Sequence, residues 1–129
     1  MSRSRRGFTL LEVLVVLALL GLAAGVAAPR AMQAMAGAQE RGWRNDVMAR
    51  IESLPARAFL SGQPISMTAE ALLRELPPPR DGITLELRQP LRYTALGLAV
   101  GGELRLAFDA RPAERWRVEP ATGRITVTP

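Results

Sequence analysis

A single carboxylate, Glu12, lies inside an apolar segment that runs from Phe8 to Ala28 and otherwise contains no ionisable side chain. On insertion scales, an acid costs about 2.5–3.5 kcal/mol at the centre of a membrane-spanning helix and less near its end. Such an acid calls for a cationic partner. If the chain is cleaved after Gly7, the new α-amino group of Phe8 is a cation, one helical turn before Glu12 on the same face. The expected chemistry is an ion pair, within one chain or between neighbouring chains in a bundle of helices.

The apolar segment is about 21 residues long, or roughly 31 Å as a helix, which matches the hydrocarbon thickness of a bilayer. It follows the leader Met1–Arg6, which contains three arginines and no acid. A secretory signal peptide also starts with basic residues, and residues 24–28 (Ala-Gly-Val-Ala-Ala) offer a small-x-small cleavage site, but its apolar core is shorter. A plain membrane anchor explains the length and the arginines and leaves Glu12 without a partner.

Residues 6–17, Arg-Gly-Phe-Thr-Leu-Leu-Glu-Val-Leu-Val-Val-Leu, resemble the class III signal of type IV pilins and type II secretion pseudopilins. The resemblance implies that a prepilin peptidase cleaves between Gly7 and Phe8 and N-methylates Phe8. It also implies that Glu12 is the glutamate used in assembly and that Pro29 is the proline that kinks the helix. The implied partners are other pseudopilins or pilins, the prepilin peptidase and an inner-membrane assembly platform.

Charge indicates how the chain is oriented in the membrane. The 17 basic residues are all arginine and exceed the 12 acidic residues to give a formal charge of +5. Without the three leader arginines, 14 arginines against 12 acids leave +2. The positive-inside rule places the leader in the cytoplasm. We therefore expect a single-pass protein of the bacterial inner membrane with a periplasmic head.

Composition argues against an enzyme. Histidine and cysteine are absent, which removes imidazole bases, thiol nucleophiles, thiolate metal sites and disulfides. Chemistry based on carboxylates alone, as in glycosidases, is not excluded by composition. We expect no catalytic residue, no cofactor and no bound metal, and the 129 residues allow one small domain beyond the membrane segment.

Residues 30–54 are rich in helix-forming side chains, and Val47, Ile51 and Leu54 recur as one apolar stripe. Pro55 is expected to end or kink this helix. Thr68 is expected to cap a short helix over residues 69–76.

From Ile83 onward the period changes to the alternation of half-buried strands. We predict strands over residues 83–88, 91–94, 103–108, 115–119 and 124–128, with turns at Gly101-Gly102 and Thr122-Gly123. The predicted fold class is α+β: a long N-terminal transmembrane helix leading into a small antiparallel β-sheet head, as in pilins. The predicted divisions are residues 1–7 (leader), 8–28 (transmembrane half-helix), 29–55 (periplasmic half-helix) and 56–129 (head).

The C-terminal half resembles the H-type minor pseudopilins through residues 91–104, Trp116-Arg117-Val118 and residues 121–125. Ala99 stands where many members carry serine. The resemblance implies a minor pseudopilin at or near the tip of a periplasmic pseudopilus that assists protein export across the outer membrane. The alternative is a minor pilin of a type IV pilus, which primes assembly or takes up DNA. The resemblance implies that DNA binding by such minor pilins uses basic residues near the C-terminus. In this chain no arginine follows Arg124, so we expect no nucleic-acid partner.

Two clusters of charged residues admit a binding interpretation. Asp81, Glu103, Asp109 and Glu114 could contribute to a calcium site, but their spacing lacks the alternating acids of a calcium loop, so solvated acids in turns are expected instead. Arg111, Arg115 and Arg117 flank Trp116 and could form a nucleic-acid patch. A solvated strand face, with Trp116 in the core, is the expected arrangement.

Overall fold

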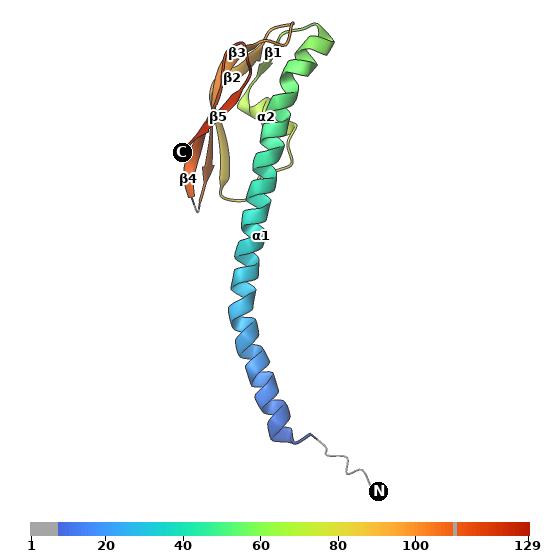
Figure 1. Cartoon of the computed structure of the whole chain (residues 1–129), viewed down its shortest axis with the longest axis vertical. Coiled ribbons are helices and arrows are strands. Elements are labelled where there is room, and N and C mark those ends of the chain that lie inside the picture. Colours follow the sequence, from blue (N-terminus) through green and yellow to red (C-terminus); the bar gives the residue numbers. More distant parts are fainter. Residues whose placement is uncertain (1–7, 110) are drawn as a thin grey trace. The chain divides into compact units, whose positions relative to one another are not determined.

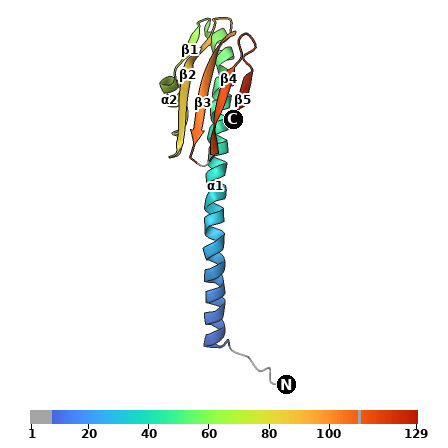
Figure 2. The ribbon, with the colours of Figure 1, turned by 90° about the vertical axis from the view of Figure 1, so that its left-hand side faces the viewer.

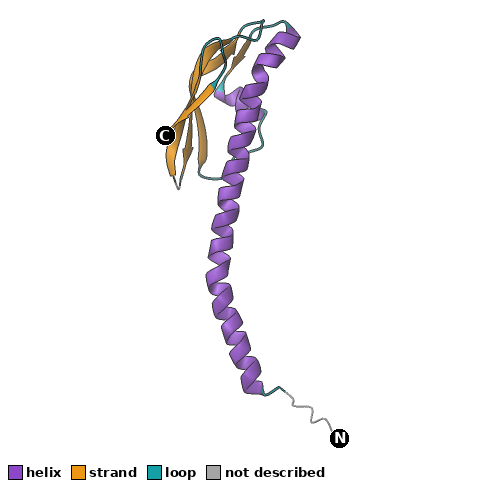
Figure 3. Ribbon diagram, viewed as in Figure 1, coloured by secondary structure: helices purple, strands orange, loops and turns teal. Residues whose placement is uncertain are grey.

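The computed structural model describes residues 8–109 and 111–129. Its elements, in chain order, are α1 (Leu10–Ser61), β1 (Ile65–Met67), α2 (Ala69–Arg74), β2 (Ile83–Tyr93), β3 (Ala99–Phe108), β4 (Arg111–Val118) and β5 (Ile125–Thr128) (Figures 1 and 3). A long N-terminal helix followed by a five-stranded antiparallel sheet confirms the predicted α+β class. Contacts divide the chain into two compact units, Met1–Ala38 and Gln39–Pro129.

Of the two effects predicted for Pro55, an end or a kink, the first is wrong, because helix α1 continues through Pro55 and ends at Ser61. Proline removes one helical hydrogen bond, but the flanking Leu54 and Ala58 are fully buried in the core and hold this turn in place. The helix stops where Gly62 adopts φ 63°, and the Gly62 amide donates to the Phe59 carbonyl at 3.2 Å. Glycine tolerates this left-handed conformation, which is common just beyond the end of a helix.

The five strands follow one another as a meander in the order β1-β2-β3-β4-β5 (Figure 2). Strand β2 joins the two predicted strands 83–88 and 91–94 into one, and shifts in register around Gln89 accommodate Pro90. Strand β1 was not predicted. Its three residues are too few for alternation to be recognised.

The predicted turn at Gly101-Gly102 is wrong, because both glycines lie inside β3. The chain reverses over residues 94–98, where the Thr94 amide donates to the Leu98 carbonyl at 2.9 Å. Gly102 is required by packing and not by a turn. A Cβ there would lie 2.5 Å from Leu91 Cδ2 and 3.0 Å from Leu91 Cα, and the backbone atom cannot move aside as easily as a side-chain end, so a side chain is disfavoured beside β2.

The core of the Gln39–Pro129 unit forms between the second half of α1 and one face of the sheet. Val47, Ile51 and Leu54 are fully buried, which confirms the predicted stripe, and Trp116 is also fully buried. Helix α2 confirms the predicted cap, since Thr68 Oγ1 accepts a hydrogen bond from the Ala71 amide at 3.3 Å.

Candidate functional site

The first turn of α1 is fixed by Thr9. Its hydroxyl oxygen accepts a hydrogen bond from the Glu12 amide at 3.2 Å, and its carbonyl accepts from the Glu12 and Val13 amides at 3.1 and 3.3 Å. Thr9 therefore caps the helix and satisfies amide groups that have no partner within the first turn. The sequence signal was present, because Thr-x-x-Glu before an apolar run is typical of a capping box, although no role was predicted for Thr9.

Glu12 lies in the first turn of α1, where the aligned peptide dipoles favour a negative charge. Within residues 8–109 and 111–129, the Glu12 carboxylate takes part in no ion pair. In the uncleaved chain Phe8 carries an amide, so the proposed ammonium partner does not yet exist. The predicted cleavage site includes Gly7, which lies outside the described residues.

The N-terminal part of α1 exposes its apolar side chains. An 18-residue window of the helix has a mean hydropathy of 2.6, and none of it is buried within the chain. Phe8, Leu10 and Leu11 are 72–82% exposed. By length and composition this helix could cross a membrane. Pro29 lies inside α1, and the helix continues past it.

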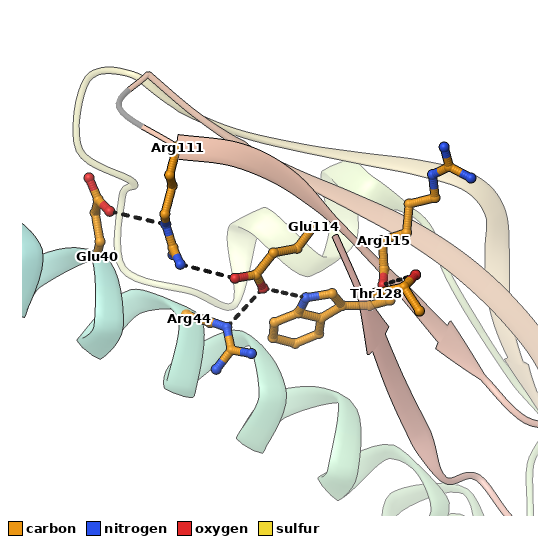
Figure 4. Close-up of polar contacts among 7 residues, drawn as sticks. Glu40, Arg44, Arg111, Glu114, Arg115 and Thr128 are labelled. Carbon is orange, nitrogen blue, oxygen red and sulfur yellow. Dashed lines mark hydrogen bonds and ion pairs between the residues drawn. The ribbon is translucent and has the colours of Figure 1, made fainter.

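A second polar arrangement lies in the head, where Glu114 accepts three hydrogen bonds. The donors are Arg44 Nε at 2.9 Å, Arg111 Nη1 at 3.0 Å and Trp116 Nε1 at 2.9 Å (Figure 4). Burial raises the pKa of Glu114, but the hydrogen bonds from Arg44 and Trp116, with the charges of Arg44 and Arg111, bring the pKa below its ordinary value. Arg111 also pairs with Glu40 at 3.4 Å. These contacts join α1 to β4.

The four acids considered for calcium are not brought together. Glu114 is engaged with arginines, and no cluster of three or more potential ligands occurs among the described residues. The three arginines near Trp116 do not form a single surface patch either. Arg111 joins the Glu114 cluster, whereas Arg115 and Arg117 are exposed, and the ring of Trp116 is too deeply buried to stack on a base.

Comparison with known protein families gives one match. Residues 2–28 match the family model described as the prokaryotic N-terminal methylation motif. No curated protein and no solved structure matches the chain. The match covers the N-terminal segment alone and indicates a type IV prepilin-like N-terminus with a hydrophobic helix; such a motif implies processing by a prepilin peptidase and assembly with other pilins. Motif and helix together fit a single-pass anchor in the inner membrane and suggest a structural subunit.

Proposed function

We propose that the protein is a minor pseudopilin of a type II secretion system. The observation that carries the proposal is the coincidence of the methylation motif with a helix whose apolar surface is unburied within the chain. Exposed apolar surface of this extent needs lipid or other helices around it. A subunit that first resides in the membrane is surrounded by lipid, and after it joins a helical filament it is surrounded by other helices.

Three residues have proposed roles at the N-terminus. Cleavage between Gly7 and Phe8 creates the α-amino group, and methylation of Phe8 leaves it cationic. Glu12 then pairs with this amine, in its own chain or in a neighbour, and the pair removes the cost of a lone carboxylate in the apolar layer. Pro29 kinks α1 between its membrane-spanning and periplasmic halves. The leader arginines keep the N-terminus in the cytoplasm and the head in the periplasm.

Processing is tested by intact-mass analysis of the protein purified from membranes of its native host. We expect a mass that lacks residues 1–7 and is heavier by one methyl group. A full-length mass would contradict the filament proposal and would indicate an ordinary membrane anchor. A cut near Ala28 would indicate a secreted soluble domain and would contradict the membrane assignment of α1.

The role of Glu12 is tested by Glu12→Leu, with Leu14→Val as a neighbouring apolar control. Both variants should remain in the membrane after alkaline carbonate washing, because neither shortens the apolar segment. Glu12→Leu should lose cross-linking to other pilin-like subunits, and Leu14→Val should keep it. Loss of membrane insertion in Glu12→Leu would contradict the role given to this residue.

The choice between secretion and pilus is tested by deleting the gene. Loss of exported proteins from the medium, with surface pili intact, supports the pseudopilin. Loss of pili or of DNA uptake, with secretion intact, supports a minor pilin of a type IV pilus instead. The resemblance of residues 91–104, 116–118 and 121–125 to H-type minor pseudopilins favours the first outcome.

A further inference from the structure

The face of the sheet that points away from α1 carries two arginines without an ion-pair partner. Arg115 and Arg117 are exposed on β4 and take part in no ion pair within residues 8–109 and 111–129. In Figure 4 the side chain of Arg115 extends away from α1, on the other side of β4 from Glu114. Arg115 also lies directly opposite Arg105 of β3, and like charges in this position destabilise a sheet. Arg117 lies opposite Glu103, so the repulsion is at Arg115, and a negative group bound beside Arg115 would offset it.

A shallow hollow lies beside these arginines. Its volume is about 290 Å³, and it is lined by Glu103, Arg115, Arg117, Glu119, Thr126 and Thr128. The two threonines belong to β5, and in the register of the sheet Arg117 is opposite Thr126 and Arg115 is opposite Thr128. Short threonine side chains at the edge of the sheet leave the guanidinium groups accessible from that edge.

Strand β5 is also an edge strand. In the described sheet it pairs with β4 and has no strand on its other side. Edge strands are usually protected by charged residues, proline or bulges. Residues 125–128, Ile-Thr-Val-Thr, contain no charge and no proline and favour extended structure. This edge is therefore open to the addition of another strand.

We propose that this face binds an extended acidic segment of a partner protein, which adds to β5 as a strand and places carboxylates in the hollow against Arg115 and Arg117. Side chains on one face of a strand recur at every second residue. Acids two residues apart would therefore lie beside Thr126 and Thr128, in the same rows as the two arginines. The inference concerns the head alone and holds for either kind of filament.

The same residues favour a polypeptide over a nucleic acid. Glu103 and Glu119 also line the hollow and would repel the evenly spaced charges of a nucleic-acid backbone, whereas a peptide can place single carboxylates beside Arg115 and Arg117 and neutral residues elsewhere. Trp116, which lies between the two arginines in the sequence, is fully buried and offers no stacking surface. A partner strand, in contrast, gains directional backbone hydrogen bonds along β5.

The test uses the full chain in detergent and a fluorescent synthetic peptide in which glutamate alternates with threonine and valine. A second peptide carries glutamine at each glutamate position. We expect the glutamate peptide to bind more tightly and Arg115→Gln/Arg117→Gln to weaken its binding about tenfold, as two exposed ion pairs of about 0.7 kcal/mol each would do. Arg88→Gln/Arg92→Gln removes the same charge from exposed sites on β2 and should change binding less than about twofold.

Hydrogen exchange on the complex supplies a readout of strand addition, since amides of residues 125–128 should become protected. Raising the salt concentration should weaken binding of the glutamate peptide to the unmodified chain, which tests the charge term without any substitution. Equal binding of both peptides, equal effects of the two double variants, or unprotected β5 amides would overturn the proposal. So would an oligothymidylate that displaces the peptide and depends on Arg115 and Arg117. Failure here leaves the leader-processing test unaffected.

Discussion

Replacing Glu114 by glutamine should destabilise the head markedly. The carboxylate accepts from Arg44, Arg111 and Trp116, and its side chain is 14% exposed. An amide keeps one oxygen acceptor and turns its NH2 group toward these donors, so at least one hydrogen bond to a charged group is lost. Such a bond contributes about 1.5–3 kcal/mol. Because the two arginine side chains are 29% and 35% exposed, we expect a net loss of about 2 kcal/mol.

The effect should depend on pH in a defined direction. The pKa of Glu114 in the folded head is below its ordinary value, so ionised Glu114 stabilises the fold above the pKa of the unfolded chain. This contribution is lost as the pH falls through the lower pKa of the folded state. The difference in stability between the unmodified chain and E114Q should therefore be full near pH 7 and decrease below about pH 4.

Thermal unfolding of the full chain in detergent, followed by tryptophan fluorescence, measures both effects. For a unit of this size, about 2 kcal/mol corresponds to a decrease in Tm of about 8–16 °C. Glu86→Gln is the control, because Glu86 is 67% exposed and lies 3.9 Å from Arg105, and it should change stability by less than about 0.5 kcal/mol. A Tm for E114Q equal to that of the control at pH 7 would refute the assigned role.

Three further substitutions test the packing of the head, each by urea unfolding monitored by tryptophan fluorescence. Gly102→Ala should destabilise by about 1–3 kcal/mol, because the new Cβ would lie 2.5 Å from Leu91 Cδ2; an unchanged midpoint would contradict this contact. Gly42→Ala should stabilise by up to about 1 kcal/mol, since this helical glycine has open space around it, and a loss would show an unseen neighbour. Trp43→Phe should cost about 1–3 kcal/mol, because it removes the hydrogen bond from Nε1 to the Pro77 carbonyl at 3.0 Å; a smaller cost would mean that water replaces the bond.

Local patterns in the sequence were sufficient to predict most of the fold. The stripe of Val47, Ile51 and Leu54 is a helical period, and strict alternation over residues 83–88 is a strand period. Neither signal depends on distant residues. The position of Gly102 was misread because the same residue type serves both tight turns and close packing. Only the neighbouring strand, with Leu91 against it, decides between the two.

The polar sites differ in how far they could be predicted. The cap at Thr9 was visible as Thr-x-x-Glu, because a cap is a local arrangement of four residues. The cluster at Glu114 was not, because Arg44 reaches it from a position 70 residues earlier in the chain. Alternation in β4 marks which side chains face α1, but it does not identify the helix residue that lies opposite.

The apolar surface of α1 does not by itself select a filament over the membrane. Lipid tails are as apolar as leucine, so moving the helix from lipid into a bundle of helices gains little from the hydrophobic effect. Selection must come from groups that lipid cannot satisfy, and Glu12 is the ionisable one in the segment from Phe8 to Ala28. Thr9 makes the same hydrogen bond in lipid and in a bundle of helices, because its hydroxyl accepts from the Glu12 amide of its own helical turn. Assembly should therefore depend on the charge at Glu12, whereas formation of the first helical turn should depend on Thr9.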